Sequence, residues 1–192
     1  MEKYQRTIFE SAWLRPLMRK ASALFFWINA WEIIRSVEIP KKCVIAAIPH
    51  KTWLDLPYTI MIAFDLNLHI RILAKEELFQ NPFGTALAFL GCNPVNRSVH
   101  TGAVGLHAKR LAESTVPLQL VIPPEGTRKG VECWKMGFYW IALEAKVPIA
   151  LFYIDYKNRR VIVGKLLTPT GDVDADMKIV KDFYKQYEVE EE

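Results

Sequence analysis

Residues 43–55 read CVIAAIPHKTWLD and join a continuous apolar run to a polar segment. The run 43–48 is typical of a strand that is buried on both faces of a parallel sheet. Residues 53–66 then predict a helix, because the one proline among them is tolerated in a first helical turn. His50 and Asp55 both lie where the predicted strand gives way to this helix. The stretch therefore predicts a strand–loop–helix unit with polar side chains in and beside its loop.

Strands and helices alternate along the rest of the chain in the same way. Strands are predicted at 43–48, 70–74, 118–122, 149–154 and 161–165. Helices are predicted at 7–35 (one or two, interrupted near Pro16), 53–66, 83–90, 101–114, 136–146 and 174–187. This alternation predicts an α/β fold, a single domain with a largely parallel central sheet flanked by helices. Because ligand sites in such sheets lie beyond the carboxyl ends of the strands, the loops after Ile48, Ala74 and Ile122 are expected to converge.

The composition of the 192 residues supports one folded core. A hydrophobic content of 51% and a charged content of 24% are ordinary for a globular protein. A formal charge of +4 is too small to predict nucleic acid as a partner. The three cysteines, Cys43, Cys92 and Cys133, form no CxxC pair, so reduced and buried thiols are expected rather than disulfides or a zinc site. This cysteine usage predicts a cytoplasmic setting.

Residues 1–38 are predicted to form N-terminal amphipathic helices at a membrane interface, before an α/β domain at 39–188 and an acidic tail at 189–192. The apolar stretch 21–34 is interrupted by polar residues and falls short of the ~18–20 apolar residues that cross a bilayer. Tryptophans and basic residues are frequent here, and both suit a bilayer surface. We therefore expect a peripheral or monotopic protein on the cytoplasmic face of the membrane. A helix packed on the core or in a dimer contact is the alternative, and the oligomeric state stays open.

The pair His50 and Asp55 carries the first sign of chemistry. Five residues of a regular helix turn through about 500°, so the two side chains meet only if His50 precedes the helix and Asp55 lies in its first turns. A carboxylate bonded to one ring nitrogen fixes the tautomer and leaves the other nitrogen able to take a proton. No GxSxG motif supplies a serine, so the proton would come from a hydroxyl on a substrate. The alternative is a histidine that merely caps the helix.

Two further loops carry charged residues. The stretch PEGTR at 124–128 follows a predicted strand, and GCNPVNR at 91–97 is predicted to be another loop that ends in an arginine. Two arginines in strand-end loops can grip a phosphate dianion bidentately. No metal site is predicted, because His100 and His107 have no carboxylate spaced to join them. A solvated helix surface is expected for both histidines.

The order of these motifs resembles that of the glycerolipid acyltransferases, and of the lysophosphatidic acid acyltransferase group in particular. The family's first block, a histidine and an aspartate with four residues between them, is matched by His50 and Asp55. Its later blocks are matched by Gly91, Pro94, Val95 and Arg97, by residues 124–128 without change, and by Val147, Pro148 and Ile149. The stretch before the second block is similar at Lys75, Phe79, Pro82, Phe83 and Gly84. The likeness covers residues 40–155.

The resemblance implies a role for each matched residue. His50 would act as the general base and Asp55 would orient it. Arg97 would bind the phosphate of the acceptor. The other substrate-binding residues that the resemblance suggests are Lys75, Glu125, Gly126, Thr127 and Arg128. No metal and no prosthetic group is implied, and acyl-CoA or acyl carrier protein would bring the acyl group as a co-substrate.

The implied function is an O-acyltransferase that moves a fatty acyl group from a thioester to the free hydroxyl of a lysophospholipid. The simplest acceptor is 1-acyl-sn-glycerol 3-phosphate, which gives phosphatidic acid. Three alternatives stay open. The acceptor could be another lipid such as a lyso-aminolipid, the protein could bind lipid without catalysis, or water could replace the acceptor in a thioesterase.

Overall fold

The structure, a computed structural model, describes residues 6–49, 52, 54–80, 82–95, 102–125 and 134–188. Within this part of the chain a seven-stranded sheet has the order β1-β7-β6-β2-β5-β3-β4. The strands are β1 Glu32–Arg35, β2 Lys42–Ile48, β3 Ile70–Lys75, β4 Cys92–Val95, β5 Leu118–Val121, β6 Ile149–Asp155 and β7 Arg160–Leu167. The helices are α1 Leu14–Ile28, α2 Asp55–Asp65, α3 Gly84–Phe89, α4 Ala103–Glu113, α5 Gly137–Ala145 and α6 Val173–Glu188. Two short 3₁₀ helices are η1 Ile8–Glu10 and η2 Glu76–Phe79.

The central part of the sheet is parallel. β2 pairs in parallel with both β5 and β6, and β3 pairs in parallel with β5 and β4. β7 runs antiparallel to β6, and β1 runs parallel to β7. The prediction of one α/β domain with a largely parallel sheet flanked by helices is therefore confirmed. The carboxyl ends of β6, β2, β5, β3 and β4 all lie at the same edge, which is where the motif-bearing loops begin.

Two strands differ from the prediction. Residues 32–35 were expected to be helical, but α1 ends at Ile28 and Glu32–Arg35 form strand β1, where Glu32 N–H donates to the Arg159 carbonyl at 2.9 Å. Residues 92–95 were expected to be a loop, but they form edge strand β4. Pro94 is compatible with an edge strand because its missing N–H would face away from the sheet. β1 also brings part of the predicted N-terminal region into the sheet of the α/β domain.

The N-terminal helix is continuous through Pro16, which lies in the first turn of α1. Backbone amides in a first turn have no acceptor within the helix, so the missing N–H of a proline costs nothing there. Ser22, fully buried, anchors α1 on α2 by donating to the Met61 carbonyl at 2.6 Å. Among the helices that the structure describes, none is both long enough and apolar enough to cross a bilayer. The predicted acidic tail, 189–192, lies outside the described residues.

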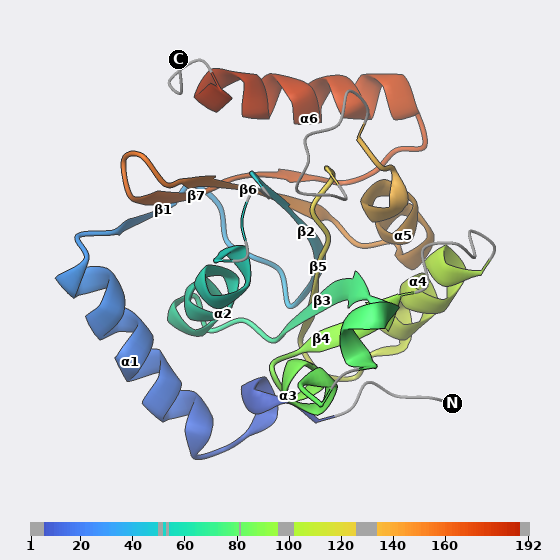
Figure 1. Ribbon diagram of the computed structural model, residues 1–192. Helices are drawn as coiled ribbons and strands as arrows, with labels where there is room; N and C mark the ends of the chain where they lie inside the picture. Colours follow the sequence, from blue (N-terminus) through green and yellow to red (C-terminus); the bar gives the residue numbers. More distant parts are fainter. Residues whose placement is uncertain are drawn as a thin grey trace.

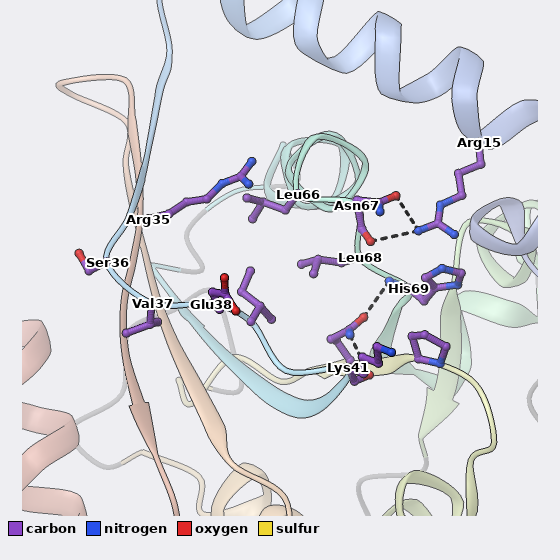
Figure 2. Close-up of a pocket in the computed structure, with 13 residues that line it drawn as sticks. Arg15, Arg35, Ser36, Val37, Glu38, Lys41, Leu66, Asn67, Leu68 and His69 are labelled. Carbon is purple, nitrogen blue, oxygen red and sulfur yellow. Dashed lines mark hydrogen bonds between the residues drawn. The ribbon is translucent and has the colours of Figure 1, made fainter.

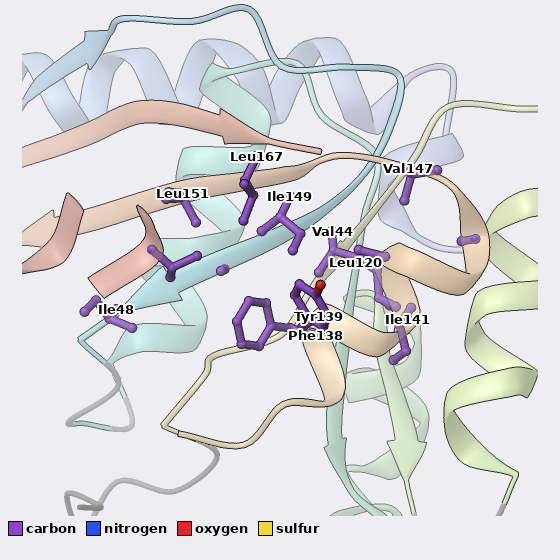
Figure 3. Close-up of a cluster of buried hydrophobic side chains, with 14 of the residues drawn as sticks. Val44, Ile48, Leu120, Phe138, Tyr139, Ile141, Val147, Ile149, Leu151 and Leu167 are labelled. Atoms are coloured by element: carbon purple, nitrogen blue, oxygen red, sulfur yellow. The ribbon is translucent and has the colours of Figure 1, made fainter. Parts of the chain in front are cut away.

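Two apolar layers cover the two faces of the sheet. Alternation along β2 sends Val44, Ala46 and Ile48 to one layer and Cys43 and Ile45 to the other. α4, α5 and α6 complete the first layer, and η1, α1 and α2 complete the second. Figure 1 shows α1 and α2 on one side of the sheet and α5 and α6 on the other, and Figure 3 shows how the first layer fills the space between α5 and the strands.

Buried polar groups in these layers bear on two predictions. Cys43 and Cys92 are buried free thiols, and burial raises their pKa values to about 12 and about 11, as expected of reduced core cysteines. Cys133 lies outside the described residues. The prediction that His107 lies on a solvated helix surface is wrong, because His107 belongs to the buried face of α4 with Ala108 and Leu111 and is only 3% exposed. Burial first, and then the charge of Arg110, lower the pKa of His107 to about 4.

Candidate active site

The carboxylate of Asp55 is the centre of the candidate site. Asp55 is the first residue of α2 and is 5% exposed. Its Oδ1 accepts a hydrogen bond of 2.7 Å from the Tyr156 hydroxyl and one of 3.1 Å from the Thr52 hydroxyl. Its Oδ2 accepts a hydrogen bond of 2.9 Å from the Thr52 amide. These three donors hold the carboxylate in one orientation, and its place at the start of a helix favours a negative charge there.

The short connection between β2 and α2 explains how the sequence brings Asp55 to this edge. β2 ends at Ile48 in the centre of the sheet, and α2 begins only seven residues later. Thr52 lies between them and binds Asp55 through both its amide and its side chain, so the connection folds back on the helix start. His50 belongs to this connection but lies outside the described residues, so its predicted contact with Asp55 stays a prediction.

Tyr156 was missed by the sequence analysis. It directly follows β6, whose neighbour in the sheet is β2, and Tyr153 of β6 is in register with Ile48 of β2. The two strands therefore end side by side, and Tyr156 reaches Asp55 across 101 residues of sequence. The rule that ligand sites lie beyond strand ends was applied to three predicted strands but not to 149–154. Applying it to that strand would have singled out Tyr156.

Glu125 follows β5, the other neighbour of β2. The carbonyl of Pro124 accepts a hydrogen bond of 2.8 Å from the Lys135 amide, so Pro124 and Lys135 lie side by side. The side chain of Glu125 lies near Tyr184 of α6. Burial raises the pKa of the Tyr184 phenol well above its usual value, and the negative charge of Glu125 adds to this. Glu125 and Asp55 therefore follow adjacent strands at the same edge, as the sequence predicted for their loops.

Lys75 ends β3, which is two strands away from β2 in the order β2-β5-β3. Its side chain is exposed at the same edge of the sheet as the loops of Asp55 and Glu125. Parallel strands are spaced by about 4.8 Å, so Lys75 starts about 10 Å along this edge from the end of β2. The described part of the chain thus brings Asp55 and Glu125 onto neighbouring strands, and Lys75 farther along.

The remaining predicted site residues, Arg97, Gly126, Thr127 and Arg128, lie outside the described residues. The described residues that precede them are Val95, which ends β4, and Glu125, which follows β5. Both are at the carboxyl edge of the sheet. No group of three or more His, Cys, Asp or Glu side chains that could hold a metal ion occurs within the described ranges.

A cavity of about 730 Å³ lies at the opposite edge of the sheet. It is lined by the connection between β1 and β2, by the end of α2 and by the start of β3, as Figure 2 shows. Arg15 closes one side by donating to the Asn67 carbonyl at 3.0 Å and to its side-chain oxygen at 2.8 Å. Of the predicted site residues, the three that the structure describes, Asp55, Lys75 and Glu125, do not line this cavity, so it is separate from the carboxyl edge where they lie.

Comparison with known proteins identifies the family. The sequence model of the family described as Acyltransferase matches residues 32–154, which is more than half of the chain. The chain belongs to the Acyltransferase family. The matched range begins at β1 and ends within β6, so it includes Asp55, Glu125 and Lys75. A comparison with curated protein sequences gave no match.

The fold of this acyltransferase is similar to a solved structure of known activity. That structure is the crystal structure of the 1-acyl-sn-glycerophosphate (LPA) acyltransferase PlsC from Thermotoga maritima, with a TM-score of 0.59 and a sequence identity of 20%. The likeness covers 90% of this chain and 78% of that one. The family match makes the chain an acyltransferase, and its fold is that of a glycerolipid acyltransferase.

Proposed function

We propose that this acyltransferase moves a fatty acyl group from acyl-CoA or acyl carrier protein to the free hydroxyl of 1-acyl-sn-glycerol 3-phosphate, giving phosphatidic acid. The observation that carries the proposal is the Asp55 carboxylate. It is buried, fixed by three hydrogen bonds at the carboxyl end of a central strand, and five residues after a histidine. The acceptor class is supported by the fold of PlsC, described as an LPA acyltransferase.

The chemistry needs one base and no metal-bound nucleophile. His50 takes the proton of the acceptor hydroxyl while that oxygen attacks the thioester carbonyl carbon. The tetrahedral intermediate then expels the thiolate as the carbon–sulfur bond breaks, and the His50 imidazolium returns the proton to the sulfur. Asp55 favours the imidazolium through its charge and holds the ring. General-base help of this kind contributes typically about 10²–10⁴-fold to the rate.

The acceptor phosphate would be held by cations from neighbouring loops. Arg97 follows β4, and Arg128 follows Glu125 in the loop after β5, with the amides of Gly126 and Thr127 beside it in sequence. A planar guanidinium binds phosphate through two parallel hydrogen bonds, which is why arginine suits this task. Lys75, which ends β3, adds a positive charge at this edge.

We further propose that α1 binds the cytoplasmic surface of a membrane as a peripheral or monotopic element. Five exposed residues of α1 and its N-cap are large and apolar: Trp13, Leu17, Leu24, Trp27 and Ile28. At 100° per residue these positions fall on one face of the helix. Exposed Arg19 and Lys20 of the same helix add positive charge that suits anionic lipid. Trp13 is 72% exposed and Trp27 is 78% exposed, which is costly in water but favourable at the headgroup level of a bilayer.

A donor–acceptor panel tests the proposed function. Purified protein is given one labelled acyl thioester and, in separate reactions, 1-acyl-glycerol 3-phosphate, a lyso-aminolipid or no acceptor. We expect saturable transfer to the lysophosphatidic acid and little acyl release without it. His50→Ala and Asp55→Asn should lose transfer by about 10²-fold or more while keeping the wild-type circular dichroism spectrum.

Each rival function has its own outcome in this panel. Preferred transfer to the lyso-aminolipid would change the acceptor and keep the catalytic pair. Acyl release at the same rate with and without acceptor would identify a thioesterase. Wild-type turnover by folded His50→Ala would remove the catalytic pair from the reaction, and inactivity of the wild type toward every acceptor would favour a lipid-binding protein.

A further inference from the structure

The Tyr156 hydroxyl donates a hydrogen bond of 2.7 Å to the Asp55 carboxylate, which is shorter than either bond from Thr52. We propose that Tyr156 is a positioning residue of this acyltransferase, which fixes the plane of the Asp55 carboxylate and so the orientation of the imidazole that Asp55 holds. The inference rests on the proposed role of Asp55 in the catalytic pair. Tyr156 acts through Asp55 and has no assigned contact with substrate.

The turn that carries Tyr156 is itself fixed. Asp155, 4% exposed, accepts hydrogen bonds of 2.8 Å from both the amide and the side chain of Asn158, and it pairs with Arg160 at 2.9 Å. Burial alone would raise the pKa of Asp155, but the hydrogen bonds from Asn158 and the charge of Arg160 outweigh it and lower that pKa. Asp155, the residue before Tyr156, therefore holds the connection between β6 and β7 through the amide and side chain of Asn158 and the guanidinium of Arg160.

The ring of Tyr156 is held on two sides by other aromatic rings. Tyr58 of α2 lies with its centroid 5.5 Å away at an interplanar angle of 88°, and Trp31 lies 5.9 Å away at 85°. Trp31 and Tyr58 also contact each other at 5.0 Å. Edge-to-face contacts of this kind prefer a definite geometry, and each contributes about 0.5–1.5 kcal/mol beyond simple burial. The ring packing therefore directs the hydroxyl toward Asp55.

The protonation state of Tyr156 makes it a constant donor. Burial, the hydrogen bond to Asp55 and the negative charge of Asp55 all raise the pKa of Tyr156 well above its usual value. The phenol keeps its proton over the whole range in which the enzyme would be assayed. A carboxylate oxygen that always accepts this hydrogen bond cannot rotate away without losing it. A water molecule in place of the Tyr156 hydroxyl would be free to leave.

The test compares two tyrosines that make the same bond to different aspartates. Tyr156→Phe removes the hydroxyl next to Asp55 and keeps the ring. Tyr139→Phe is the matched control, because the Tyr139 hydroxyl donates to Asp176 at 2.8 Å in a buried site on α5. The amide of Thr170, just after β7 ends, donates to Asp176, so Asp176 lies near the end of β7. Because β7 runs antiparallel to β6, this bond is at the opposite edge of the sheet from Asp55.

We expect Tyr156→Phe to lower kcat by about 10-fold to 100-fold, the worth of a hydrogen bond to a charged group, with KM for donor and acceptor unchanged. Tyr139→Phe should lower the thermal midpoint but keep the wild-type kcat when assayed below that midpoint. In an Asp55→Asn background the further change Tyr156→Phe should cost less than about threefold, because the two side chains act as one unit.

Several results would overturn the inference. A wild-type kcat in Tyr156→Phe, or a loss confined to KM, would show that the hydroxyl does not act through the reacting pair. An equal loss of kcat in Tyr139→Phe would mean that any lost tyrosine bond has this effect. The same factor in the Asp55→Asn background would show independent action. If Asp55→Asn itself keeps full activity, the proposed catalytic pair fails as well, so the two failures are distinguishable.

Discussion

Thr52 binds both oxygens of Asp55, through its amide to Oδ2 at 2.9 Å and through its hydroxyl to Oδ1 at 3.1 Å. The two bonds close the connection between β2 and α2 onto the first residue of the helix. In the sequence, His50 belongs to this same connection. Thr52, close in sequence, and Tyr156, distant in sequence, each donate one hydrogen bond from a neutral hydroxyl to the Asp55 carboxylate.

Loss of the Thr52 hydroxyl should weaken catalysis more than folding. In Thr52→Val the amide bond to Asp55 stays and the side chain keeps its shape, so the losses are the bond to Oδ1 and the bond of 3.2 Å that the hydroxyl accepts from the Leu54 amide. We expect kcat to fall about 10-fold and the free energy of unfolding to fall by about 1 kcal/mol. Steady-state kinetics and urea denaturation measure the two effects. Thr52→Ser keeps the hydroxyl and should recover most of the kcat, and a serine variant as slow as the valine one would argue against this role.

The exposed tryptophans of α1 should control membrane binding. The double variant Trp13→Ser with Trp27→Ser removes the two most exposed aromatic rings of this region, at 72% and 78% exposure. We expect binding to anionic phospholipid vesicles in a sedimentation assay to fall by about 10-fold or more, while turnover of detergent-dispersed substrate is retained.

Trp140 supplies the control for this membrane prediction. It is 42% exposed on α5, which covers the other face of the sheet, so Trp140→Ser should leave vesicle binding unchanged. Equal losses of binding in both variants would point to general hydrophobic adhesion, and retained binding in the double variant would remove α1 from the membrane contact.

Buried His107 should make the protein sensitive to mild acid. Its pKa is lowered to about 4 in the folded state against the ordinary value of 6.5, so between these pH values the unfolded chain binds a proton that the folded chain does not. Stability is therefore lost as the pH falls from 6.5 toward 4, by roughly 3 kcal/mol in full. In His107→Gln the loss of unfolding free energy between pH 7 and pH 4.5, measured with urea, should be smaller by roughly 2 kcal/mol. Asp155 and Asp176 titrate in both proteins and cancel in the comparison, so equal acid sensitivity would contradict the assignment.

Gly164 should be intolerant of a side chain. A Cβ atom at this position of β7 would overlap the ring of Phe183 on α6. We expect Gly164→Ala to lower the free energy of unfolding by about 2 kcal/mol, and Phe183→Leu in the same chain to restore part of it. Gly137→Ala is the control, since no atom lies within 4 Å of the added Cβ, and it should be neutral. A neutral Gly164→Ala would mean that α6 packs farther from the sheet than the structure has it.

Local patterns in the chain predicted most of the elements. β2 and α2 were expected at 43–48 and 53–66 and occur at Lys42–Ile48 and Asp55–Asp65. A continuous apolar run and a 3.6-residue period are properties of neighbouring residues, so they are visible without the fold. The short edge strands β1 and β4 were missed, because four residues are too few to show a period and each depends on a partner strand far along the chain.

The amino-acid order alone indicated the class of fold, the acyltransferase motifs and the edge of the sheet at which they gather, because strand ends and motif positions are both local features. Tertiary structure alone revealed that Tyr156 donates to Asp55, that His107 is buried and that Trp13 and Trp27 stay exposed. Each of these depends on which strands and helices become neighbours. The arrangement of strands and helices is determined by the burial of apolar surface over the whole chain, so it cannot be read from any stretch of neighbouring residues.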